Sequence, residues 1–72
     1  MSFQAYLDNV EAKTGKSADA LKAIAIDKGL ADQDSLAAGV KATAIVDWLK
    51  RDFDLGHGHA MSIVAYIKGK RN

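Results

Sequence analysis

The sequence predicts an all-α fold, a small bundle of four short helices that forms one domain over residues 1–72. The chain contains no Pro, the residue that most strongly interrupts helices. Apolar residues recur at helical spacing in four segments, and Ser or Gly residues stand at several of their ends. The chain also has no Cys, so disulfides cannot stabilise it, and the fold must rest on apolar packing.

The first helix is expected over residues 2–14. One apolar stripe runs along it at i, i+3, i+4 and i+7: Phe3, Tyr6, Leu7 and Val10. Ser2 is expected to cap its start, because a hydroxyl can accept a hydrogen bond from a free N–H group of the first turn. Gly15 follows its end, where a left-handed backbone conformation is common.

The second helix is expected over residues 18–28, with Ser17 as its N-cap. Gly29 and Leu30 follow it in the order typical of a Schellman ending, a left-handed glycine and then an apolar residue. The sequence therefore predicts where this helix begins and where it ends.

Residues 31–40 contain Asp, Gln and Ser close together and are predicted to form a loop, which Leu36 and Val40 anchor to the core. The third helix is expected over residues 41–54. It contains Trp48, the largest side chain of the chain, and we expect this side chain at the centre of the core.

The fourth helix is expected over residues 58–68, and it repeats the apolar stripe of the third. Nearly all large apolar side chains are expected to be buried: Phe3, Leu7, Val10, Leu21, Ile24, Ile45, Trp48, Leu49, Phe53, Ile63, Val64 and Ile67. Four of them are predicted to form the structural core around the last two helices: Trp48, Leu49, Phe53 and Ile63.

A tight turn, Gly56-His57-Gly58-His59, is predicted to join the last two helices. Two glycines around one residue favour unusual dihedral angles, so replacing Gly58 with Ala is expected to destabilise the fold if the turn needs a positive φ. The turn leads into a helix N-terminus, whose free N–H groups can bind an anion. These four residues are therefore the candidate binding turn.

Three functional interpretations of this turn compete with a structural one, in which the His side chains satisfy helix-end groups or pack against Trp48 or Tyr66. The first is nucleic-acid backbone binding. An apolar-Gly-x-Gly pattern between helices is similar to helix-hairpin-helix modules, although these usually have an aliphatic residue where His57 stands. Lys50 and Arg51 would support phosphate contacts, and two neighbouring Asp residues would oppose them.

The second interpretation is a metal site on His57 and His59 with Asp54 as a third ligand, but zinc normally needs at least three protein ligands. The third is acid–base catalysis by His59, with Ser62 three residues later. No nucleophile motif accompanies these residues, and so small a core leaves little room for a pocket. We therefore predict no catalytic residue, no metal site and no cofactor.

Charge and hydropathy indicate no particular class of partner. The formal net charge is +1, and no apolar run approaches the ~20 residues of a membrane span, so we expect a soluble cytoplasmic protein. Met61 and Ile26 lie off the apolar stripes, so they are either scattered exposed apolar residues or parts of a patch for self-association. The leading prediction is a non-enzymatic interaction module that binds an unknown protein or a second copy of itself. The alternative is nucleic-acid backbone binding through the Gly56-His57-Gly58-His59 turn.

Two stretches of the chain resemble the signature of a bacterial family, the domain of unknown function 4287. One is IVDWLKRDFDLGHGHAMSI at residues 45–63, and the other runs from Tyr6-Leu7 through EAKTGK at residues 11–16. The GHGHAM segment with WLK upstream is the most specific part. The resemblance implies a compact helical module, and it brings no activity, cofactor or substrate with it.

Overall fold

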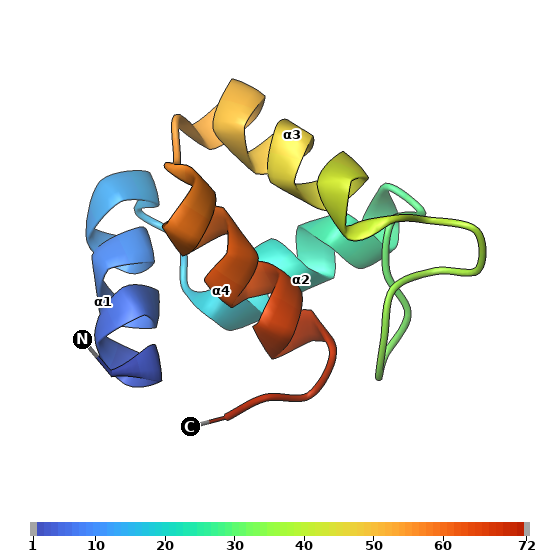
Figure 1. Ribbon diagram of the computed structural model, residues 1–72, viewed down its shortest axis with the longest axis horizontal. Coiled ribbons are helices and arrows are strands. Elements are labelled where there is room, and N and C mark those ends of the chain that lie inside the picture. Colours follow the sequence, from blue (N-terminus) through green and yellow to red (C-terminus); the bar gives the residue numbers. More distant parts are fainter. Residues whose placement is uncertain (1, 72) are drawn as a thin grey trace.

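The computed structural model describes residues 2–71 and confirms the all-α class (Figure 1). The four helices of these residues are α1 (Phe3–Thr14), α2 (Ala18–Asp27), α3 (Ala42–Phe53) and α4 (His57–Ile67). In Figure 1, α4 crosses α2, with α1 on one side of it and α3 on the other. Since α4 contacts each of the other three helices, it is the central helix of the bundle.

The predicted caps are present at the ends of α1 and α2. The hydroxyls of Ser2 and Ser17 each accept a hydrogen bond of 3.1 Å from the N–H group three residues later. Gly15 and Gly29 both adopt the left-handed conformation, with φ of 74° and 78°. The N–H group of Leu30 then donates to the carbonyl five residues earlier, which completes the Schellman ending of α2.

Residues 31–40 form the predicted loop, with one isolated antiparallel bridge between Ala31 and Leu36. Ala31 is buried, and the half-buried Leu36 and Val40 pack against the core. Apolar side chains therefore anchor the loop at both ends, as expected for Leu36 and Val40.

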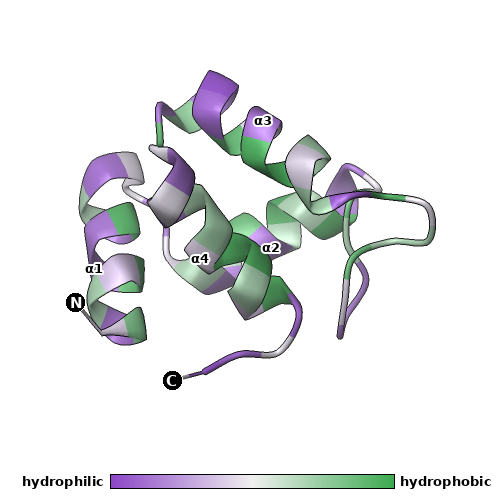
Figure 2. Cartoon of the chain, viewed as in Figure 1, coloured by the Kyte–Doolittle hydropathy of each residue, from purple (hydrophilic) through white to green (hydrophobic). Residues whose placement is uncertain are grey.

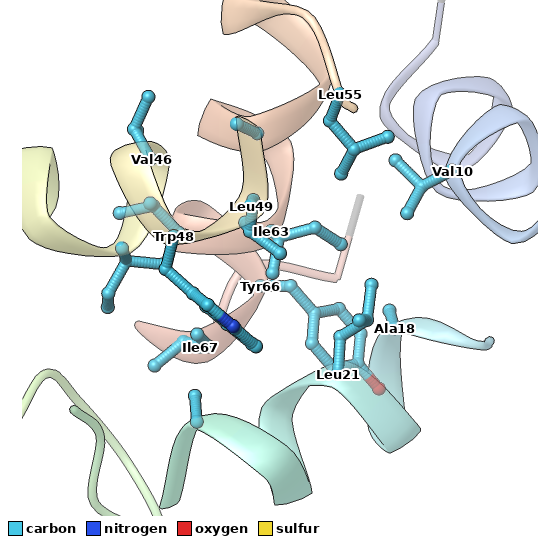
Figure 3. Close-up of a cluster of buried hydrophobic side chains, with 14 of the residues drawn as sticks. Val10, Ala18, Leu21, Val46, Trp48, Leu49, Leu55, Ile63, Tyr66 and Ile67 are labelled. Atoms are coloured by element: carbon cyan, nitrogen blue, oxygen red, sulfur yellow. The ribbon is translucent and has the colours of Figure 1, made fainter. Parts of the chain in front are cut away.

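The core lies between α4 and the three helices around it, and Figure 2 shows hydrophobic residues of α1 and α3 on the sides that face α4. Most of the predicted core residues are buried: Leu7, Val10, Leu21, Ile45, Trp48, Leu49, Ile63, Val64 and Ile67. Figure 3 shows several of them converging between the helices. Phe3, Ile24 and Phe53 are only half-buried, because they pack against this cluster from its edge.

The connection between α3 and α4 differs from the predicted turn. Helix α4 begins at His57 rather than Gly58, so only Asp54, Leu55 and Gly56 separate the two helices. The positive φ of this connection, 56°, belongs to Asp54, one of the few residue types besides Gly that adopt it readily. Gly56 is extended, with φ −73° and ψ 166°, so the expectation of unusual glycine dihedral angles was wrong. The chain reverses earlier than predicted because Leu55, which is 3% exposed, enters the core.

Candidate functional site

The candidate binding turn forms the start of α4, at the corner where this helix meets α3 (Figure 1). Gly56 is the N-cap and offers no side-chain hydrogen bond to the helix. The first intrahelical hydrogen bond runs from the N–H of Ala60 to the carbonyl of Gly56 at 2.9 Å. The N–H groups of the first three helical residues therefore have no partner within the helix. Since Gly56, His57 and Gly58 are all exposed, this helix end is open to solvent.

His59 has a different environment from His57, because its side chain turns toward α1. It is half-buried, and its ring meets that of Tyr6 edge to face, with centroids 5.1 Å apart. The sequence did not indicate this packing partner, which comes from α1 because that helix lies beside the first turn of α4. The Nε2 atom of His59 is buried and has no hydrogen-bond partner among the described residues.

The Ser62 hydroxyl lies one turn after His59 but does not bond to its imidazole. Ser62 Oγ donates a hydrogen bond of 2.6 Å to the His59 carbonyl, and Ser62 is buried. The hydroxyl thus stabilises a turn of α4 and does not form a nucleophile–base pair with the ring. Within residues 2–71, no group of three His, Cys, Asp or Glu side chains is arranged to hold a metal ion.

Basic side chains approach the corner from two helices. Lys50 and Arg51 are exposed in the last turn of α3, and Arg51 pairs with Asp52 at 3.1 Å. Lys13 of α1, which the sequence did not indicate, donates a hydrogen bond of 3.5 Å from its Nζ to the Asp54 carbonyl. The fold therefore brings an additional cation to the candidate turn, from 41 residues away in the chain.

Replacing Gly58 with Ala is expected to raise the midpoint of thermal unfolding. Gly58 lies inside α4 without a positive φ, and an added Cβ would meet only Tyr6 Cε1 at 3.8 Å, an ordinary contact. Ala favours the helix over Gly by roughly 0.5–1 kcal/mol, which corresponds to a few degrees in a domain of this size. Gly15→Ala is the control and should lower the midpoint, since Gly15 has a φ of 74°. A lower midpoint for Gly58→Ala would contradict the helical placement of this residue.

The outward face of α4 is uncharged. From His57 to Ile67 the helix contains no Asp, Glu, Lys or Arg. Met61 is 38% exposed, and it is the one large hydrophobic side chain among residues 2–71 that is exposed. Its position off the apolar stripe predicted this exposure. The same prediction for Ile26 was wrong, because its half-buried side chain packs against the core.

A groove that the sequence did not indicate lies between α1, α2 and α4. Its volume is about 180 Å³, and its lining consists of Gln4, Leu7, Asp8, Glu11, Ser17, Ala18, Asp19 and Tyr66. Gln4 Nε2 donates a hydrogen bond of 2.9 Å to Asp8 Oδ1, and the Tyr66 hydroxyl donates one to Asp19 Oδ1. The only sequence signal for this groove is the spacing of Asp8 and Glu11 along one helix.

The hydrogen bond from Tyr66 to Asp19 raises the pKa of the phenol above its ordinary value of 10.0, burial adds to this effect, and Arg71 opposes it. The fold therefore favours the neutral phenol. The stability that the fold gains from the hydrogen-bonded neutral phenol is fully present below pH 10. It is lost as the pH rises through the pKa of Tyr66 in the folded state. We predict that the tyrosinate absorbance transition with the raised midpoint is lost in Tyr66→Phe and kept in Tyr6→Phe. Persistence of the same transition in Tyr66→Phe would contradict this assignment.

These features define a small all-helical module, with an uncharged central helix whose N-terminus is open at one corner and an acidic groove between other helices. The chain belongs to the family described as a domain of unknown function (DUF4287), whose model matches residues 2–69. The predicted resemblance to this family is thereby confirmed. No curated protein and no solved structure matches the chain.

None of the helices in residues 2–71 combines the length and apolar character needed to cross a bilayer.

Proposed function

We propose that this chain is a non-enzymatic interaction module that binds a second copy of itself through the outward face of α4. The observation that carries this proposal is the composition of α4, which has no charged residue along its 11 positions. Helices at the surface of globular proteins normally place charged residues on their solvent side. Here α1 and α3 follow that rule; α4 is mostly buried, but the residues that it does expose, His57, Gly58 and Met61, are uncharged as well.

The geometry of the face supports pairing with another helix. His57, Met61 and Ala65 follow one another at i, i+4 and i+8, so they lie in a stripe on one side of the helix; His57 and Met61 are exposed, and Ala65 is half-buried. Gly58 and Ala65 are small, which lets a second backbone approach closely. The same stripe on two copies can pair about a twofold axis, because a twofold interface places the same patch on both partners. A small domain gains stability from such added burial.

Sedimentation velocity over a range of concentrations tests this proposal. The wild-type chain is expected to shift from monomer to dimer as concentration rises, and Met61→Lys is expected to remain monomeric. The matched control is Ala23→Lys, which adds the same charge at an exposed position of α2 and should dimerise like the wild type. A wild-type chain that stays monomeric at millimolar concentration would overturn the proposal.

A second candidate function is binding of a nucleic-acid backbone at the corner between α3 and α4. The uncapped Gly56 and the approach of Lys13 to the connection favour it, because free N–H groups and cations both bind phosphate. An amide-shift titration with a DNA duplex should then move residues 56–59 at low salt and not at high salt. Lys13→Gln should weaken binding more than Lys28→Gln, which removes an exposed charge after α2. Absence of shifts at low salt would overturn this candidate.

A further inference from the structure

The chain that follows α4 turns back toward the start of α1 (Figure 1). Gly69 has a φ of 110°, and the N–H group of Lys70 donates a hydrogen bond of 3.0 Å to the carbonyl of Ala65. This reversal directs the exposed residues Lys70 and Arg71 along the bundle instead of away from it. Residues 69–71 are named the strap.

Arg71 anchors the strap to α4. Its Cζ atom is 3.9 Å from the centroid of the Tyr66 ring, and its Nη1 atom donates hydrogen bonds of 2.9 and 2.8 Å to the carbonyls of Tyr66 and Lys70. The face of an aromatic ring attracts a cation, and hydrogen bonds from a charged donor are stronger than neutral ones. Because Tyr66 is itself buried in α4, these contacts fix one end of the strap to the central helix.

Lys70 connects the strap to α1. Its Nζ atom is 5.3 Å from the centroid of the Phe3 ring, a distance at which a ring still attracts a cation. Phe3 is the first residue of α1 and is only half-buried, whereas the buried residues of this helix, Leu7 and Val10, lie further along it. The strap therefore contacts the end of α1 that the core holds least firmly.

Helix α1 in turn covers one side of α4. The Tyr6 ring lies against the His59 ring, and the Nε2 atom of His59 is buried there. An outward movement of α1 would uncover this side of α4, a helix without charged residues. Contacts that hold the start of α1 therefore control access to the side of α4 that carries His59.

We propose that the strap is a conformational latch, whose two cations hold α1 against α4. When Lys70 and Arg71 leave their aromatic rings, α1 opens while the other three helices stay packed, and the His59 side of α4 becomes accessible. One exposed cation–π contact changes an equilibrium by about two- to fivefold. The latch thus sets how often α1 opens, and it does not depend on the self-association proposed above.

Hydrogen exchange of backbone amides, followed by NMR, measures local opening of this kind. Lys70→Gln should speed exchange of the Leu7 and Val10 amides in α1 by about two- to fivefold and leave that of Leu49 in α3 unchanged. Lys70→Arg keeps the charge and should exchange like the wild type. The matched control is Lys68→Gln, which removes an exposed cation that lies over no aromatic ring of residues 2–71. Equal acceleration in α1 and α3, or none in α1, would overturn the proposal.

A double-variant comparison tests whether the Phe3 ring is the partner of Lys70. Phe3→Leu keeps an apolar side chain but removes the aromatic face, so adding Lys70→Gln to it should not speed exchange in α1 any further. A full additional acceleration would contradict the latch. Met61→Lys should leave the response of α1 to Lys70→Gln unchanged, so failure of self-association and failure of the latch are distinguishable.

Discussion

The variant Trp48→Ala is expected to lose most of the stability of the fold. Trp48 is 3% exposed, and its ring meets that of Phe53 edge to face with centroids 5.8 Å apart. Removing a buried aromatic side chain costs about 3–5 kcal/mol, which is a large part of the total stability of a small domain. Urea unfolding followed by helical circular dichroism measures this loss, since the variant lacks the only Trp of the chain.

Trp48→Phe is the control, because it keeps an aromatic ring at the same place. Trp48 Nε1 is buried and has no hydrogen-bond partner among the described residues, so the Phe variant forfeits no hydrogen bond there. The Phe variant should therefore unfold at a urea midpoint well above that of the Ala variant. Identical midpoints for the two variants would show that packing of this ring does not hold the helices together.

The variant Ile63→Ala should be destabilised by about 2–5 kcal/mol, through lost burial and the cavity that remains. Ile63 is fully buried in α4, and Figure 3 shows it beside Leu49 in the centre of the cluster. Because α4 contacts all three other helices, a cavity at this position weakens the packing of the whole bundle. Chemical unfolding monitored by the fluorescence of Trp48 measures the change.

Met61→Ala is the matched control on the same helix, at low protein concentration. Met61 is 38% exposed and lies on the outward face, so truncating it should change the free energy of unfolding by about 0.5 kcal/mol or less. If the two variants lost similar stability, the assignment of inward and outward faces of α4 would be wrong.

The positions and ends of α1 and α2 follow from the sequence alone. Ser2 and Ser17 cap N–H groups three residues away, and Gly15 and Gly29 end helices by adopting a positive φ. Such interactions act within about one turn, so neighbouring residues contain the information that specifies them. Apolar periodicity likewise identifies the buried side of each helix, which is why most core residues were predicted correctly.

The start of α4 could not be predicted from the local pattern. Either a glycine of the GHGH segment or Asp54 could supply the left-handed residue that reverses the chain. Burial of Leu55 against the other helices selects Asp54, and His57 then becomes the first helical residue. The choice depends on which side chain the core accepts, and that is a property of the packed bundle.

Some features of the candidate site could likewise be predicted from the sequence, and others depend on how the helices pack. The exposed start of α4 was predicted, because Gly56, His57 and Gly58 are neighbours in the chain. The contact of Lys13 with Asp54 spans 41 residues, and the hydrogen bond between Tyr66 and Asp19 spans 47. A helical pattern shows which side of a helix is apolar, but it does not show which two helices meet. Only the tertiary structure therefore decides that three carboxylates line one groove and that an uncharged face of the central helix stays open.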